Sequence, residues 1–233
     1  MAVSKKKYID TIPKEPRKEG VILFGRGPSV DLLEPNIINN QDKYDTCTLT
    51  DAIKLLKHPT YSFCYHFKGL VRIWKFVKNP KYLLLPSVIV SSYIDKLTRM
   101  KKDLVSKEVD TNKAILQYDN TYLFLSKHIK LDALMKGLFD NEIKQTVYQS
   151  YGSVVGAFHF LTAYMGYKKI LYIGFDGGKK YGRKVANGRK GYKAEQAAIG
   201  YKKSWYSLEI MKKFYPEVKL EPLTEFMKKA ITI

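Results

Sequence analysis

Short apolar runs alternate with amphipathic stretches along most of this chain. Runs of four to six apolar residues that end at glycine, proline or a polar residue are typical of buried strands, and apolar residues three or four positions apart are typical of helices. The pattern predicts strands at 21–24, 44–49, 60–67, 82–90, 121–126, 169–176 and 218–224. It predicts helical segments at 29–37, 50–58, 70–78, 93–108, 131–139, 153–165 and 194–215.

The clearest local unit is the stretch SVVGAFHFLTAYMGYKKILYIGFDGG, which begins at Ser153. Small and apolar residues recur at helical spacing up to Met165, Gly166 stands where a helix C-cap glycine belongs, and a strand runs on to Asp176. A helix followed by a strand in this way is typical of a parallel sheet. We therefore predict an α/β fold with a Rossmann-like, doubly wound, mostly parallel sheet.

The length of 233 residues with 45% hydrophobic composition suits one domain with a full core. We expect a loosely ordered basic arm at 1–20, a nucleotide-binding domain at 21–233, and a lid-like basic segment at 178–213. No window approaches the roughly 20 apolar residues of a membrane span, and the start of the chain lacks a secretory signal. The two cysteines, Cys47 and Cys64, lie in strand-like stretches, which indicates buried thiols and a reducing, cytoplasmic location.

The chain carries a large excess of positive charge. The chain has 41 Lys and Arg against 22 Asp and Glu, a net charge of +19. This excess predicts a polyanionic partner such as nucleic acid, an acidic glycan or an anionic membrane surface. The alternative is that lysine is simply used on every surface. Between Lys179 and Lys213 there are eleven Lys or Arg and two acids, interleaved with tyrosines.

The stretch VILFGRGPS at 21–29 is the first candidate site. Parallel α/β sheets bind ligands at the carboxyl ends of their strands, where glycines let the main chain approach a phosphate. We expect Gly25 and Gly27 to allow that approach and Pro28 to stiffen the turn. Ser29 can cap the short helix that follows or donate a hydrogen bond to an anion, and Arg26 can bind phosphate. The pattern lacks the third glycine of the dinucleotide fingerprint and the Lys of a P-loop, and a tight structural turn is the alternative.

Together, VILFGRGPSV and the unit from Ser153 to Asp176 resemble the bacterial lipooligosaccharide sialyltransferases and their relatives, the flagellin-modifying glycosyltransferases and 6-hydroxymethylpterin pyrophosphokinase-like domains. The two motifs cover about 35 residues. The resemblance implies a Rossmann-like fold and a nucleotide-sugar donor, with CMP or UDP as the nucleotide. Arg26 stands where the sialyltransferases usually have asparagine. The donor-binding residues implied are Gly25, Arg26, Gly27, Pro28, Ser29, Thr48, Thr50, Asp51, Tyr151, Gly152 and Ser153.

The resemblance also implies metal-independent transfer, and the chain has no Asp-x-Asp motif. Tyr192 and Tyr201, with Tyr181, are candidates to stabilise the departing phosphate from the lid, or else pack its helix. The lid histidine that serves as base in the sialyltransferases has no counterpart after His159. Asp176, at a strand's carboxyl end, is our preferred base, and its alternative role is to cap the following turn. His159 is the second candidate, and its alternative role is that of a packed core residue.

Three functions stay open at this point. The first is a glycosyltransferase acting on an anionic acceptor, either an acidic glycan or DNA with a hydroxylated base. Contacts to that acceptor are expected from Lys179, Lys180, Arg183, Lys184, Arg189 and Lys190. The second is a pyrophosphokinase that uses ATP and Mg²⁺ on a small alcohol such as a pterin. The third is a non-catalytic nucleic-acid-binding protein whose basic segment carries stacking aromatics. The remaining histidines, His58, His66 and His128, show no metal-ligand spacing and are interpreted as solvated or strand-end residues.

Overall fold

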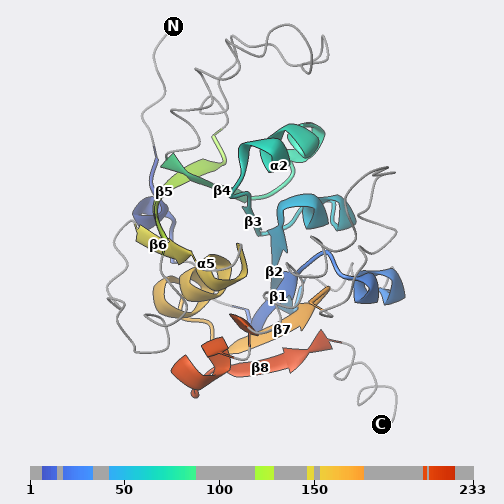
Figure 1. Cartoon of the computed structure of the whole chain (residues 1–233), viewed down its shortest axis with the longest axis vertical. Helices are drawn as coiled ribbons and strands as arrows, with labels where there is room; N and C mark the ends of the chain where they lie inside the picture. Colours follow the sequence, from blue (N-terminus) through green and yellow to red (C-terminus); the bar gives the residue numbers. More distant parts are fainter. Residues whose placement is uncertain are drawn as a thin grey trace, which may run out of the picture.

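A computed structural model of the chain describes residues 7–14, 18–33, 42–87, 119–128, 146–149, 153–175, 207–208 and 210–223. These residues form a parallel sheet in the order β6-β5-β4-β3-β2-β1-β7-β8 (Figure 1). The strands are β1 (Gly20–Phe24), β2 (Tyr44–Leu49), β3 (Tyr61–Phe63), β4 (Tyr82–Pro86), β5 (Thr121–His128), β6 (Thr146–Gln149), β7 (Lys169–Ile173) and β8 (Lys219–Pro222). The α/β class and the parallel sheet are confirmed.

The helical segments are short. They are the 3₁₀ turns η1 (Ile9–Thr11), η2 (Pro28–Leu32), η3 (Thr50–Leu55) and η4 (Trp74–Phe76), the α-helices α2 (Phe67–Arg72) and α5 (Ser153–His159), and the π-helical turn η6 (Phe160–Tyr164). Residues 210–214 are also helical. Gly166 follows η6 with φ +67°, so the predicted C-cap glycine is confirmed. The helices predicted at 93–108 and 131–139 lie outside the described residues.

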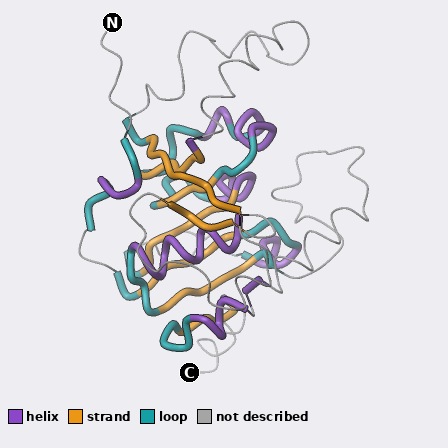
Figure 2. Tube along the Cα trace, turned by 60° about the vertical axis from the view of Figure 1, so that its left-hand side comes forward, coloured by secondary structure: helices purple, strands orange, loops and turns teal. Residues whose placement is uncertain are grey.

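The sheet is covered on both faces (Figure 2). Successive residues of β1 point to opposite faces, and all are buried, which explains why its sequence is continuously apolar. Val21 and Leu23 pack in the core cluster that includes α5 and η6, whereas Ile22 and Phe24 pack in the cluster that includes η2. A third cluster lies under α2 and η4.

Two features differ from the sequence-based expectation. Ile9 and Ile12 are buried in the core, and the amide of Leu123 in β5 donates to the carbonyl of Lys7, so this part of the predicted arm belongs to the fold. Strand β6 was not predicted, because Thr146–Gln149 is short and half polar. It pairs with the second half of β5, beginning at Leu125.

An ion cluster joins the amino ends of β1, β2 and β7. Lys169 and Tyr44 both donate hydrogen bonds to Glu19, and these bonds lower the pKa of Glu19 to about 2. Lys169 also donates to the Tyr44 hydroxyl at 2.8 Å. The cluster fixes three neighbouring strands at this edge and leaves the opposite, carboxyl edge to the loops that follow β1, β2, β3 and β7.

Candidate functional site

The strand register brings four loops to one edge of the sheet. Phe24 of β1 is aligned with Thr48 of β2 and with Ile173 of β7, and Leu49 of β2 is aligned with Phe63 of β3. The chain leaves β1 towards β2 on one side, and returns later to β7 on the other side. The β1 turn therefore lies where the strand order reverses, which is the usual ligand position in open parallel sheets.

The predicted turn after β1 is bound tightly to the end of β7. The Gly25 amide donates to the Ile173 carbonyl at 2.7 Å, and the Gly27 amide donates to the Gly174 carbonyl at 2.7 Å. Ser29 accepts a hydrogen bond from the Gly174 amide through Oγ, at 2.8 Å. These two glycine amides and the Ser29 hydroxyl thus hold the protein together at this edge.

The need for glycine at this turn has a packing cause. A Cβ on Gly25 would lie 2.4 Å from the Gly174 carbonyl oxygen, and a Cβ on Gly174, which has φ +81°, would lie 2.6 Å from the Gly25 carbonyl carbon. Gly27 has φ −67° and ψ 169°, which is ordinary extended backbone. The close approach that we assigned to a phosphate is, at Gly25, an approach to the neighbouring strand.

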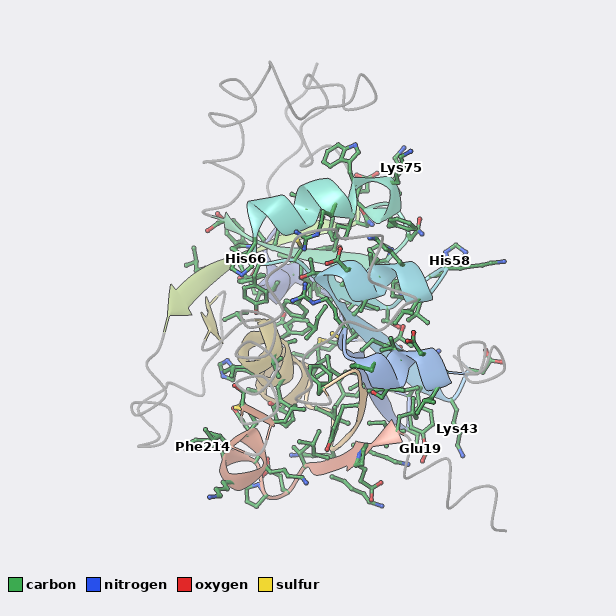
Figure 3. The ribbon with its side chains drawn as sticks, turned by 45° about the vertical axis from the view of Figure 1, so that its right-hand side comes forward. Glu19, Lys43, His58, His66, Lys75 and Phe214 are labelled. Atoms are coloured by element: carbon green, nitrogen blue, oxygen red, sulfur yellow. The ribbon has the colours of Figure 1, made fainter. Side chains whose placement is uncertain are left out.

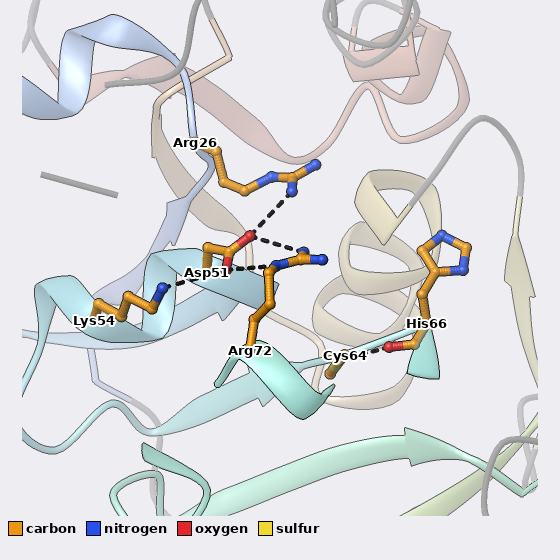
Figure 4. A network of polar contacts seen from close by, with 6 residues as sticks. All are labelled: Arg26, Asp51, Lys54, Cys64, His66 and Arg72. Atoms are coloured by element: carbon orange, nitrogen blue, oxygen red, sulfur yellow. Dashed lines mark hydrogen bonds and ion pairs between the residues drawn. The ribbon is translucent and has the colours of Figure 1, made fainter. Parts of the chain in front are cut away.

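Arg26, between the two glycines, points to an acid of the next loop (Figure 4). Its Nη1 lies 3.3 Å from Oδ2 of Asp51, which follows β2 at the start of η3. Asp51 is 3% exposed. Asp51 also accepts two hydrogen bonds from Arg72, from Nε to Oδ1 at 3.1 Å and from Nη2 to Oδ2 at 2.9 Å. Its Oδ1 forms an ion pair with Nζ of Lys54 at 3.4 Å.

Helix α2 carries Arg72 to this carboxylate because the helix packs closely on the β2 loop. Gly69 lies against that loop, where a Cβ would be 2.7 Å from Cγ2 of Thr50 and 3.2 Å from Sγ of Cys64. A larger residue at this position would force the Thr50 side chain or the helix to shift. Sequence inspection did not identify Arg72 or Lys54 as site residues, because nothing in the local sequence links Arg72 to an acid 21 positions earlier.

Three cations therefore converge on one carboxylate, and we call Arg26, Asp51, Lys54 and Arg72 the Asp51 cluster. Burial alone raises the pKa of Asp51, but the hydrogen bond from Arg72 and the charges of Arg72, Arg26 and Lys54 outweigh it and lower that pKa. The side chains of Arg26 and Arg72 are 32% and 34% exposed. The four groups sum to a charge of about +2, so their surroundings favour an anion.

The backbone is strained in the loop that follows β2 and carries Asp51. Thr50 has φ +50°, in the left-handed region that β-branched residues rarely adopt, and it stands directly before Asp51. Such a conformation costs on the order of 1–3 kcal/mol and is found mainly where function or tight packing requires it. Here it turns the chain sharply from β2 into η3, which places Asp51 inside the cluster.

His66 lies beside the Asp51 cluster at the carboxyl end of β3 (Figure 4). The residue is exposed, and its pKa is lowered by partial desolvation and by the positive charges of Arg26 and Arg72. Its imidazole is therefore neutral at pH 7 and able to accept a proton. The Cys64 thiol, close by, is buried and donates weakly to the His66 carbonyl, and burial raises the pKa of Cys64 to about 12. The sequence predicts His66 to be a solvated or strand-end residue, and its exposure and its position after a short strand agree with that prediction.

Other predicted site residues have structural contacts. Thr48 is fully buried, and its hydroxyl donates to Oγ of Ser62 at 3.0 Å. His159 is 1% exposed within the α5–η6 segment, and burial lowers its pKa to about 4. This burial favours the core interpretation of His159 over a catalytic one. The prediction of two buried thiols is confirmed for Cys47 and Cys64.

Ser153 begins α5, at its predicted position. The remaining predicted residues lie outside the described part of the chain, so their roles stay predictions: Tyr151, Gly152, Asp176, Lys179, Lys180, Arg183, Lys184, Arg189, Lys190, Tyr192 and Tyr201.

Within the described residues, no group of three or more His, Cys, Asp or Glu side chains is placed to hold a metal ion. Among the same residues, no helix is long and apolar enough to cross a membrane. Comparison with protein-family models, curated proteins and solved structures finds no match to this chain.

Proposed function

We propose that this chain is a glycosyltransferase that moves a sugar from a nucleotide-activated donor to an anionic acceptor, on a Rossmann-like, doubly wound sheet. The observation that carries the proposal is the Asp51 cluster at the carboxyl edge, where an arginine of the β1 turn and an arginine of α2 meet beside the reversal of strand order. The resemblance of the β1 turn and the α5–β7 unit to the sialyltransferases supports the same reaction class.

In this proposal, the donor phosphate binds to Arg26 and Arg72. Asp51 orients both guanidiniums in advance, so that their donors need little rearrangement when negative charge develops on the departing phosphate. Lys54 is only 7% exposed and adds positive charge beside the carboxylate. Planar guanidiniums suit a phosphate because they form paired hydrogen bonds with its oxygens.

His66 is the proposed proton acceptor among the described residues. The acceptor hydroxyl gives its proton to an imidazole nitrogen, its oxygen forms the new bond to the anomeric carbon, and the bond from that carbon to the phosphate oxygen breaks. The electron pair of the broken bond stays on the phosphate, next to the two arginines. No metal takes part in these steps. Asp176 remains the alternative base.

A thermal-shift screen tests the function directly. The wild-type protein is screened against CMP-, UDP- and GDP-sugars and ATP, with Mg²⁺ or with EDTA. We expect one nucleotide sugar to raise the melting temperature in EDTA. Arg72→Gln should lose that shift, whereas Lys168→Gln, which removes an equal charge from a surface ion pair with Glu217, should keep it.

The other results are equally informative. A shift with ATP that requires Mg²⁺ would favour the pyrophosphokinase. If no nucleotide or nucleotide sugar stabilises the wild-type protein, both enzymatic functions are wrong, and the non-catalytic alternative remains.

A further inference from the structure

A long stretch of the chain beside the proposed site contains no acid. From Ala52 to Ile94 there is no Asp or Glu, whereas there are seven Lys or Arg. Its described part, up to residue 87, includes most of η3, all of β3, α2, η4 and β4, and the turns between them. A shorter acid-free stretch at 177–194 also has seven Lys or Arg, but it lies outside the described residues.

Four cations of this stretch follow one another along the end of α2, η4 and the turn before β4. After the carboxyl edge, the chain runs through α2 and η4 back to the amino end of β4, and every third residue on the way is basic and exposed. The intervening residues Ile73 and Val77 are buried against the sheet, so the basic side chains lie on the solvent side. These exposed residues, which we call the basic stripe, are Arg72, Lys75, Lys78 and Lys81.

The stripe starts in the Asp51 cluster, because Arg72 belongs to both. In Figure 3, His66 lies at the start of α2 and Lys75 lies beyond its other end. The stripe thus leads from the proposed phosphate site across the outer surface of the domain.

The far part of the stripe is held in place by hydrogen bonds. The Asn120 side-chain amide donates to the carbonyls of Val77, at 3.0 Å, and Pro80, at 2.7 Å. The Lys81 amide donates to the Pro59 carbonyl at 2.9 Å. The backbone that carries the lysines is therefore fixed before any partner binds, which lowers the entropic cost of binding.

Aromatic rings accompany the cations. Trp74 and Phe76 pack on the core cluster under α2 and η4, and both remain partly exposed between the lysines. Nucleic acid bases stack on such rings, and single strands are bound by positive grooves with aromatic platforms. The sugar rings of an acidic glycan can also pack on aromatic side chains, so we choose nucleic acid as the ligand that uses both the cations and base stacking, and heparin is the competing ligand in the test.

We propose that the basic stripe binds single-stranded nucleic acid and guides it to the Asp51 cluster as the acceptor. The role of the nucleic acid as acceptor rests on the proposed function, but its binding to the stripe does not. Phosphates contact Lys75, Lys78 and Lys81, and a base stacks on Trp74.

The test measures binding of a fluorescein-labelled 20-nucleotide single-stranded DNA by anisotropy between 50 and 300 mM NaCl. Each lysine–phosphate contact contributes about 0.7 to the slope of log affinity against log salt. We expect the triple variant K75Q/K78Q/K81Q to reduce that slope by about 2 and to bind at least tenfold more weakly at 100 mM NaCl. Trp74→Leu should weaken binding severalfold with an unchanged slope.

A matched control removes the same charge elsewhere. The variant K43Q/K168Q/K219Q neutralises three lysines of exposed ion pairs with Glu19, Glu217 and Glu221, and it should bind DNA nearly as tightly as the wild type. Equal losses in the two triple variants, or no loss in the first, would overturn the proposal. So would heparin binding that depends on the three stripe lysines together with DNA binding that does not.

Failure of this inference can be told from failure of the proposed function. The variant K75Q/K78Q/K81Q should keep the nucleotide-sugar thermal shift, since those lysines lie outside the Asp51 cluster. If the donor binds and the stripe lysines do not affect DNA, the stripe inference alone is wrong. If DNA binding depends on the stripe but no donor binds, the glycosyltransferase is wrong and the nucleic-acid surface stands.

Discussion

Replacing Asp51 by asparagine removes the negative charge from the Asp51 cluster while keeping the shape of the side chain. Breaking a buried ion pair from one side typically costs about 3–5 kcal/mol, because the partner charge stays buried. Arg26 and Arg72 are about one-third exposed, so water compensates part of this loss, and we expect a cost of about 2 kcal/mol. In a chain of this size, that lowers the melting temperature by about 4–8 °C.

An added anion should replace the lost carboxylate. Pyrophosphate present at ten times its dissociation constant stabilises the protein by about 1.4 kcal/mol, or about 3–6 °C. The assay is differential scanning fluorimetry at pH 7.5 with pyrophosphate or with NaCl of equal ionic strength. We expect pyrophosphate to raise the melting temperature of Asp51→Asn at least twice as much as that of the wild type.

The control and the pH dependence make this result specific. Glu217→Gln removes an exposed carboxylate from the Lys168 ion pair and should show neither the loss nor the recovery. Because the pKa of Asp51 is lowered in the folded state, the wild-type advantage should be complete above the ordinary value of 3.8 and shrink as pH falls through the lowered value. An unchanged melting temperature for Asp51→Asn would refute the stabilising role of Asp51, and the absence of a pyrophosphate shift in both proteins would refute an anion site at the Asp51 cluster.

The remaining predictions concern single side chains. His66→Gln should lower kcat for sugar transfer at least 100-fold and leave the donor's thermal shift intact; normal turnover would exclude His66 as the base. Tyr65→Phe should raise the melting temperature by about 2–4 °C, because the buried Tyr65 hydroxyl has no hydrogen-bond partner among the described residues. Gly156→Ala should be destabilising by about 1–3 kcal/mol, and less so with Tyr65→Phe, because its Cβ would lie 1.8 Å from that hydroxyl; additive effects in a double-mutant cycle would contradict this contact. Burial lowers the His159 pKa from 6.5 to about 4, so protonation between these values favours the unfolded chain. Between pH 7.5 and 4.5, the free energy of unfolding in urea should therefore fall by about 2 kcal/mol more for the wild type than for His159→Asn. Parallel pH profiles of the two proteins would count against that burial.

Local patterns were sufficient for most strands of the sheet. A strand buried on both faces needs a continuous apolar run, and a helix that ends at a left-handed residue favours glycine there. Strand β1 and the C-cap Gly166 could therefore be identified from the local sequence. Strand β6 could not, because Thr146–Gln149 gains its place by pairing with β5 rather than by its own apolar content. The burial of Ile9 and Ile12 could not be predicted either, because both lie in a segment rich in basic residues.

The amino-acid sequence by itself determined the α/β class, the glycine turn that follows β1 and the excess of positive charge, because each depends on residue type and on spacing over a few positions. Only the tertiary structure decided what the turn contacts: Gly25 packs on Gly174, and Arg26 meets Asp51 and Arg72. Those contacts join residues tens of positions apart through the strand register, and the pairing free energy that sets the register comes from the whole sheet and not from any local segment.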